Sequence, residues 1–246
     1  MKMLCSVMLL ALTLPFTSFA ANKNTELSQN EKVMLKNFFK YDMQNYVDSE
    51  SHIFPYDMKL ISADKIAEDY DANEARGDKD YKGQAIVISG AVERIRSTLG
   101  DVPAVELRTN IGINGVSLYF AKEYESLAID LNKGDTVKYA CLGDGAVMGS
   151  PILRRCVPVS VYVDAVSQNT YKEMLSELNG YAGGNDTVNE FLLFVKMISK
   201  ITDDYKLCSA TDSSCIINLI NKTPIEKRKE IGVQISKELG IKISAK

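Results

Sequence analysis

Two changes of hydrophobic period between residues 85 and 163 constrain the fold more than any other feature of this 246-residue chain. Apolar and polar residues alternate in three successive segments, which is typical of half-buried strands. These segments are 85–95 (AIVISGAVERI), Ala104–Arg108 and Val116–Phe120. Residues 121–131 then predict a short helix, before a fourth strand at Thr136–Leu142 and a fifth within Pro151–Val163.

Three strands, one helix and two further strands form the element order of a five-stranded OB barrel. A Rossmann or flavodoxin-like fold would need a helix after nearly every strand. We therefore predict an α+β fold: a five-stranded OB-type β-barrel with a preceding helix, followed by a small all-α C-terminal region. Within the barrel, Val105 and Leu107 should face inward, and Glu106 and Arg108 outward. Gly90 should mark a bulge or bend in the first strand.

Helices are predicted on both sides of the barrel segment. Ser28 and Glu31 form a capping box for a helix over about 29–47, and Ser62 can cap a second helix, ADKIAEDYDANEA. From residue 168 on, the pattern is helical. We divide the chain into a signal peptide, an N-terminal helical segment, an OB-fold domain and a helical C-terminal domain, with bounds 1–20, 21–60, 61–166 and 167–246.

The first twenty residues have the features of a secretory signal peptide. Lys2 gives a positive start, residues 3–16 are mostly apolar, and Ser18-Phe19-Ala20 is a small-x-small cleavage site. We expect cleavage after about Ala20 and a periplasmic or secreted protein. No later run is long and apolar enough to predict a membrane span.

Four cysteines remain after Cys5 is removed with the signal peptide, and they pair by neighbourhood: Cys141 with Cys156, and Cys208 with Cys215. In an oxidising compartment an even count predicts disulfides. Zinc would need closer spacings or histidine partners, and a C-x-x-C redox motif is absent from the sequence. We therefore predict two structural disulfides in preference to a metal site or a reactive thiol pair.

The segment from about 61 to 160 resembles a secreted OB-fold family described as tRNA-anticodon-binding-like. The resemblance rests on a helix with Tyr70 and Asn73, the strand opener Tyr81-Lys82-Gly83, the turn Lys133-Gly134-Asp135, and the paired Cys141 and Cys156. It covers less than half of the chain and implies the barrel fold. It implies no particular ligand.

The predicted barrel also suggests where a ligand would bind. OB barrels use the outer face of their second and third strands, flanked by the loops between strands 1–2 and 4–5. Here that surface would hold Arg94, Arg96, Arg108, Ser117, Tyr119 and the loop Gly143–Gly149, with Arg154 and Arg155 approaching from the fifth strand. Arginines beside an outward tyrosine could hold a polyanion, a sugar or a peptide, although solvated arginines are also ordinary on sheet faces.

Several kinds of chemistry lack the residues they need. The chain has one histidine, His52, and no G-x-S-x-G or phosphate-binding loop. Asp69–Asp80 partly follows EF-hand spacing, but Glu74 replaces the required glycine, so a solvated helix end is the better interpretation. The chain after residue 20 has 28 basic and 32 acidic residues, which argues against a duplex nucleic-acid binder. We expect no cofactor, no metal and no catalytic residue.

Four hypotheses of function follow from these residues. The first is an exported, non-enzymatic OB-fold module that recognises a protein, peptide or glycan partner in the cell envelope. The second is an immunity-type or inhibitor protein that blocks a partner enzyme. The third is an enzyme, which would need carboxylates of shifted pKa, such as Glu106 facing another acid. The fourth is a binder of single-stranded nucleic acid or another polyanion, whose affinity would fall steeply with salt.

Overall fold

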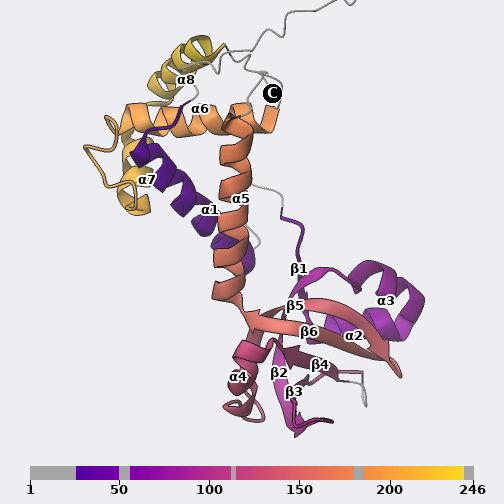
Figure 1. The fold of residues 1–246 in the computed structure, drawn as a ribbon. Coiled ribbons are helices and arrows are strands. Elements are labelled where there is room, and N and C mark those ends of the chain that lie inside the picture. Colours follow the sequence, from indigo (N-terminus) through magenta and orange to yellow (C-terminus); the bar gives the residue numbers. More distant parts are fainter. Residues whose placement is uncertain (1–25, 50–55, 112–114, 180–185, 241–246) are drawn as a thin grey trace, which may run out of the picture.

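The computed structural model describes residues 26–49, 56–111, 115–179 and 186–240. The predicted signal peptide and His52 lie outside these ranges. A β-barrel lies at one end of an elongated molecule and a group of helices at the other (Figure 1). Two long helices, α1 (Gln29–Ser49) and α5 (Val159–Asn179), run between the two ends.

The barrel has five strands in the order β2-β3-β4-β6-β5, and a pairing between β5 and β2 closes it. These strands are β2 (Ala85–Ser97), β3 (Pro103–Leu107), β4 (Val116–Phe120), β5 (Thr136–Val147) and β6 (Ser150–Pro158). All neighbours are antiparallel except β4 and β6, which are parallel. The predicted OB-type barrel is therefore confirmed, with helix α4 (Glu125–Ile129) between its third and fourth strands.

A sixth strand, β1 (Lys59–Ser62), was not predicted, because four residues are too few to show a period. It pairs in parallel with the first half of β2, while the second half of β2 pairs with β3. The two halves of β2 meet near Gly90, where a Cβ atom would lie 2.9 Å from the Cβ of Ala63. Gly90 thus permits close approach of helix α2 (Ala63–Ala72), and the bulge follows between Val92 and Arg94.

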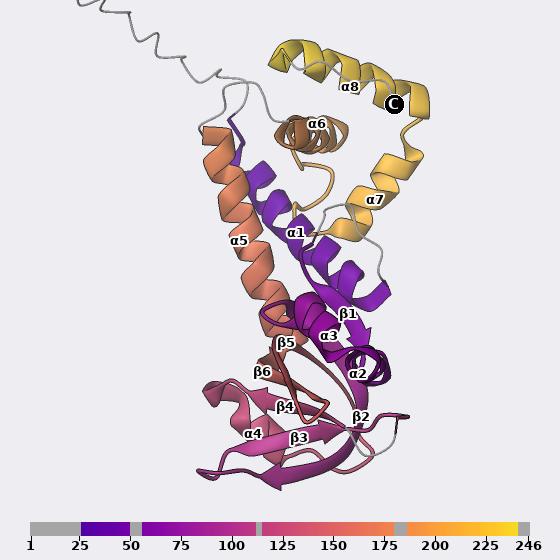
Figure 2. The same ribbon diagram turned by 90° about the vertical axis from the view of Figure 1, so that its right-hand side faces the viewer.

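Inward side chains of all five barrel strands form one apolar core, as the alternation predicted. This core includes Ile88, Val105, Leu118, Val137 and Leu153, with Ile66 and Tyr70 from α2 and Ala128 from α4. Val105, Leu107, Val116 and Leu118 are fully buried, which places the side chains that alternate with them on the outer face. Helices α2 and α4 lie outside the sheet in Figure 2. Their buried side chains belong to the barrel core.

Tyr70, Asn73 and Tyr81, three of the residues that carry the family resemblance, lie in the cover formed by α2 and α3 (Glu74–Tyr81). Asn73 ends α2 and its side chain caps α3 by accepting from the Arg76 N–H, so the predicted single helix is two helices. The Tyr70 hydroxyl donates to Asp78 over 3.2 Å, and the Tyr81 hydroxyl donates to Asp69 over 2.6 Å. These carboxylates of the Asp69–Asp80 segment therefore bond to tyrosines within a helical hairpin.

Five helices form a second apolar core away from the barrel. They are α1, α5, α6 (Asp186–Ile201), α7 (Ser213–Lys222) and α8 (Ile225–Leu239). The predicted fifth strand ends at Pro158, and helix α5 starts directly after it, so residues 159–163 are helical. The predicted domain boundary at 166/167 falls inside this helix. A third cluster joins the two cores, with Met43 of α1, Val87 and Ala140 of the barrel and Val163 of α5.

Both predicted cysteine pairs are disulfides in the structure. Cys141–Cys156 joins β5 to β6 inside the barrel core, and Cys208–Cys215 joins the segment after α6 to α7. Such bonds persist in oxidising compartments, so both fit an extracytoplasmic location. Among the helices that the structure describes, none is both long enough and apolar enough to span a bilayer.

A glycine in the helical hairpin offers a direct test of this packing. In Gly77→Ala the new Cβ would lie 2.7 Å from the buried ring of Tyr70. We expect overpacking to lower the free energy of unfolding by about 1–3 kcal/mol. Gly232→Ala is the matched control, because nothing lies within 4 Å of a Cβ there in α8. It should stabilise by about 0.5–1 kcal/mol. Urea unfolding measures both, and equal effects would contradict the packing at Tyr70.

Candidate functional site

The outer face of β2, β3 and β4 carries two cross-strand rows of side chains. In the first row, Arg94 of β2 lies opposite Glu106 of β3, which lies opposite Ser117 of β4. In the second row, Arg96 lies opposite Ala104, which lies opposite Tyr119. The bulge before Arg94 sets this register, and Ile95 between the two arginines pairs with inward-facing Val105.

Glu106 is the centre of the first row, and only 9% of it is exposed. Its carboxylate accepts two bonds from Arg94, from Nε at 2.9 Å and from Nη2 at 3.1 Å. The Nε of Arg96 lies 3.8 Å from the same carboxylate, and its Nη2 donates to the Ser117 hydroxyl at 3.4 Å. Two guanidinium groups are thus held over one carboxylate, and the bidentate pair fixes the orientation of Arg94.

A glycine next to this row makes the arrangement possible. A Cβ on Gly115 would lie 2.6 Å from Cγ of Glu106 and 2.7 Å from the carbonyl oxygen of Leu107. Any other residue at this position would displace the glutamate or the β3 backbone. In the sequence, Gly115 looks like an ordinary turn residue. Its contact with Glu106 is apparent only in the folded structure.

A second charged group lies beside the first and centres on Glu93. Its carboxylate accepts from Arg108 Nε at 2.7 Å and from Lys133 Nζ at 2.6 Å. These hydrogen bonds, that of Lys133 first, lower the pKa of Glu93 to about 2. Glu93 therefore stays ionised at any physiological pH and holds both cations in place.

The third group lies where β4 approaches β6. The guanidinium carbon of Arg154 lies 4.7 Å from the centroid of the Tyr119 ring, and Arg154 also pairs with Asp144 of β5. Arg155 follows at a bulge in β6, in the left-handed region with φ 52°. The side chain of Arg155 is exposed and makes no hydrogen bond or ion pair with any residue that the structure describes.

A cavity of about 420 Å³ opens beside the first two groups. Its walls include Glu93, Arg94, Glu106, Arg108 and Gly115. This volume is within the range of small-ligand pockets, and charged side chains line the cavity beside Leu107 and Thr109. It can therefore accommodate a polar, charged group.

The structure places the predicted surface residues on β2, β4 and β6 and directly after β3, although not all are equally available. Arg94, Arg108 and Arg154 each pair with a carboxylate, whereas Arg96 makes weaker contacts and Arg155 makes none with the described residues. The predicted loop Gly143–Gly149 is wrong: β5 extends to Val147 and only Met148 and Gly149 turn the hairpin. A two-residue turn with positive φ continues the strand twist, which the glycine-rich sequence obscured.

Sequence reasoning missed the anionic partners of this face. Glu93 and Asp144 are not among the predicted site residues, yet they pair with Arg108 and Arg154. Lys133, the second cation bound to Glu93, was also not predicted as a site residue. The alternation in VERIR and the outward position of Glu106 were the available signals. Glu106 was the example given for the enzyme hypothesis, and among the described residues its carboxylate faces two arginines.

The pKa of Glu93 gives a testable measure of this electrostatic arrangement. We expect its carboxyl carbon to titrate at about 2 by NMR, because Lys133 and Arg108 stabilise the ionised form. Lys133→Ala should raise this pKa towards the ordinary 4.5. Because the folded pKa is depressed, the contribution of Glu93 to stability is present above pH 4.5 and is lost as pH falls towards 2.

The control for this titration is Arg94→Ala, which removes a cation bonded to Glu106 instead. It should move the pKa of Glu93 much less than Lys133→Ala does. A Glu93 titration near 4.5 in the parent protein would show that the ion pairs do not persist in solution.

The chain is similar to a known protein family and to known structures. The model of the tRNA_anti-like family matches residues 1–157. No curated protein matches the chain. Among solved structures, one similar chain is a lipoprotein of Klebsiella pneumoniae subsp. pneumoniae described as nucleic acid-binding, with 19% identity and a TM-score of 0.35. The match covers 42% of the present chain and 99% of that one. Because the family model spans more than half of the sequence, the chain belongs to the tRNA_anti-like family.

Proposed function

We propose that this protein is an exported, non-enzymatic OB-fold binding module that recognises an acidic protein or peptide partner in the cell envelope. The observation that carries the proposal is the prearranged set of arginines on the outer face of β2, β3, β4 and β6. Six cationic side chains share this face with three carboxylates: Arg94, Arg96, Arg108, Lys133, Arg154 and Arg155 against Glu93, Glu106 and Asp144.

The pairing pattern divides the face into scaffold and contact groups. The carboxylates hold Arg94, Arg108 and Arg154 in fixed orientations, which lowers the entropy lost when a ligand binds. Arg96 and Arg155 retain donors for a new partner. Guanidinium groups match carboxylates in geometry and charge, so acidic side chains are the complementary groups. A neutral glycan would leave the positive excess uncompensated.

We infer the absence of enzymatic activity from the carboxylates of the same face. Glu93 remains ionised near neutral pH, since its pKa is about 2, and cannot serve there as a general acid. Glu106 is bonded to Arg94 in a bidentate pair. The single histidine of the sequence is remote in sequence from the barrel strands. Export is supported by the signal-peptide pattern and by the two disulfides.

A single-stranded nucleic acid is the second candidate ligand, because Arg154 lies beside Tyr119 in a member of the tRNA_anti-like family. Bases would bind by stacking on an open aromatic ring. Arg154 already lies over the Tyr119 ring and is itself paired with Asp144, which makes an acidic peptide the better match.

Fluorescence anisotropy with a labelled decaglutamate peptide tests the proposal, with a twelve-residue deoxythymidine oligonucleotide as the competing probe. Arg96→Ala/Arg155→Ala should weaken peptide binding by about tenfold or more, since each lost charge-assisted bond contributes about 1.5–3 kcal/mol. Lys227→Ala/Lys237→Ala removes the same charge from exposed positions on α8 and should change the affinity by less than about threefold.

Two outcomes would contradict the acidic-peptide proposal. If both double variants weaken peptide binding equally, the affinity depends only on the net charge of the protein. Tighter binding of the oligonucleotide, with a steep fall in affinity as salt rises, would identify the nucleic-acid candidate instead.

A further inference from the structure

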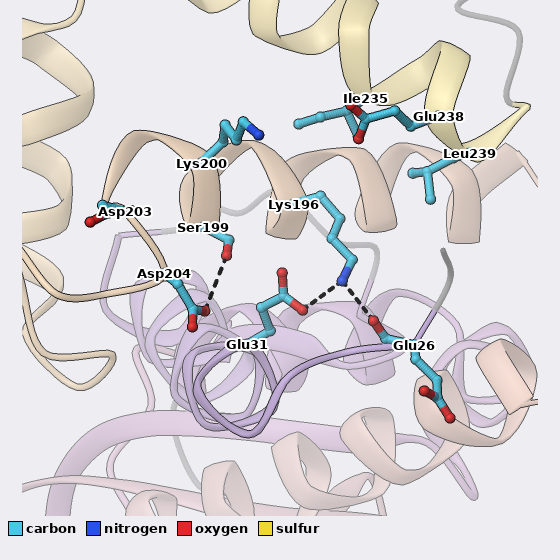
Figure 3. Close-up of a pocket in the computed structure, with 10 residues that line it drawn as sticks. All are labelled: Glu26, Glu31, Lys196, Ser199, Lys200, Asp203, Asp204, Ile235, Glu238 and Leu239. Carbon is cyan, nitrogen blue, oxygen red and sulfur yellow. Dashed lines mark hydrogen bonds and ion pairs between the residues drawn. The ribbon is translucent and has the colours of Figure 1, made fainter. Parts of the chain in front are cut away.

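A second cavity lies in the helical part of the molecule, away from the barrel face. It has a volume of about 560 Å³ and is bounded by the start of α1, by α6 and by α8 (Figure 3). Most of its lining is polar, with carboxylates from Glu26, Glu31, Asp203, Asp204 and Glu238. Lysines contribute two ammonium groups, and Ile235 and Leu239 provide an apolar wall on α8.

A buried ion pair lies between α1 and α6 at this cavity. Lys196 Nζ is 2.7 Å from Glu31 Oε2 and donates to the carbonyl oxygen of Glu26 at 2.6 Å. The side chain of Glu31 is 4% exposed and that of Lys196 is 21% exposed. The same Oε2 accepts the backbone N–H of Ser28 at 2.7 Å, which completes the predicted capping box. Glu31 therefore neutralises Lys196.

The other carboxylate oxygen of Glu31 faces the cavity. It receives no hydrogen bond from the residues that the structure describes, and it points into the space below α6 in Figure 3. It is not one of the described side-chain atoms that lack both solvent contact and a hydrogen-bond partner, so it is accessible from the cavity that Glu31 lines. The cavity thus presents an open, charged acceptor.

Tyr205 follows Asp204 in the chain but does not itself line the cavity. It is 7% exposed, and its hydroxyl has no hydrogen-bond partner among the described residues. Burial raises its pKa, and the charges of Glu31 and Asp204 raise it further. Asp203, Asp204 and Tyr205 all have positive φ, and the first two line that side of the cavity.

We propose that this cavity binds an aliphatic amine, as found in a small polyamine or a lysine side chain. An ammonium group would donate to the free oxygen of Glu31 and to Asp204. The methylene chain would lie along Ile235 and Leu239, and Glu238 on α8 would compensate further positive charge. Lys200 extends towards α8 in Figure 3. Because its ammonium group is itself positive, it lowers the affinity of the cavity for a cationic ligand.

Isothermal titration calorimetry of the purified protein with spermidine tests the proposal. We expect saturable binding of one spermidine. Asp204→Asn and Glu238→Gln should each raise the dissociation constant about five- to tenfold, because each removes one ionic partner without changing shape. Glu230→Gln removes an exposed carboxylate of α8 that does not line the cavity, and it should leave binding unchanged.

Removing a positive charge from the cavity should have the opposite effect on binding. Lys200→Gln should tighten spermidine binding several-fold, whereas Lys237→Gln, the same charge change outside the cavity, should not. Circular dichroism of each variant checks that the fold is retained. A parent protein without saturable binding would overturn the proposal, as would equal effects of Asp204→Asn and Glu230→Gln.

The source of the amine is decided by a parallel titration with tetralysine. Tighter binding of spermidine identifies a free polyamine, and tighter binding of tetralysine identifies a lysine side chain of a partner protein. Magnesium chloride at equal ionic strength is the comparison for screening: if it produces the same heat and thermal stabilisation as spermidine, the cavity is not an amine site.

Discussion

The bend in β2 is the constraint on which the rest of the structure depends. The first half of this strand pairs with β1 and β5, and its second half pairs with β3. Between them, Gly90 admits α2 at close range, and the backbone of Val92 bonds to Gly134 and Asp135. This change of partner allows five strands to close into a barrel, and the bulge that follows directs Arg94 and Arg96 outward.

Apart from Lys133, which belongs to both sets, the residues that carry the family resemblance and the residues proposed to bind ligand have different roles. Tyr70, Asn73 and Tyr81 fix the α2–α3 hairpin, while the Cys141–Cys156 bond lies within the core. None of these side chains lies in the arginine rows. A family pattern made of packing and capping residues predicts a fold well. It does not predict a ligand, because the outward positions can vary without affecting the core.

How well the sequence predicted each feature depends on the sequence separation of the residues that form it. Strand alternation and capping boxes are local, and they located the barrel strands and the start of α1 correctly. The disulfide pairs were predictable from spacing because each closes a short loop. By contrast, the parallel pairing of β1 joins residues far apart in sequence, and the Glu93–Lys133 ion pair spans 40 positions. No local period encodes such contacts.

The ion pairs of the candidate site were likewise not predictable from local sequence. Sequence reasoning counted arginines on a predicted face and could not see which ones were already neutralised. Three carboxylates reduce that set to Arg96 and Arg155 as the least engaged cations. The helical cavity is the converse case, because its lining comes from three helices whose residues share no motif.

The two proposed sites have opposite charge and lie on different cores, yet one structural element connects them. Helix α1 supplies Glu31 to the helical cavity and Met43 to the cluster that packs against Val87 and Ala140 of the barrel. Lys138 of β5 also donates to the carbonyl oxygen of Val47, near the other end of α1. A partner with both acidic and basic segments could therefore contact both regions at once. Linked contacts of this kind raise overall affinity only where the spacing permits both, and the α1–α5 connection fixes that spacing.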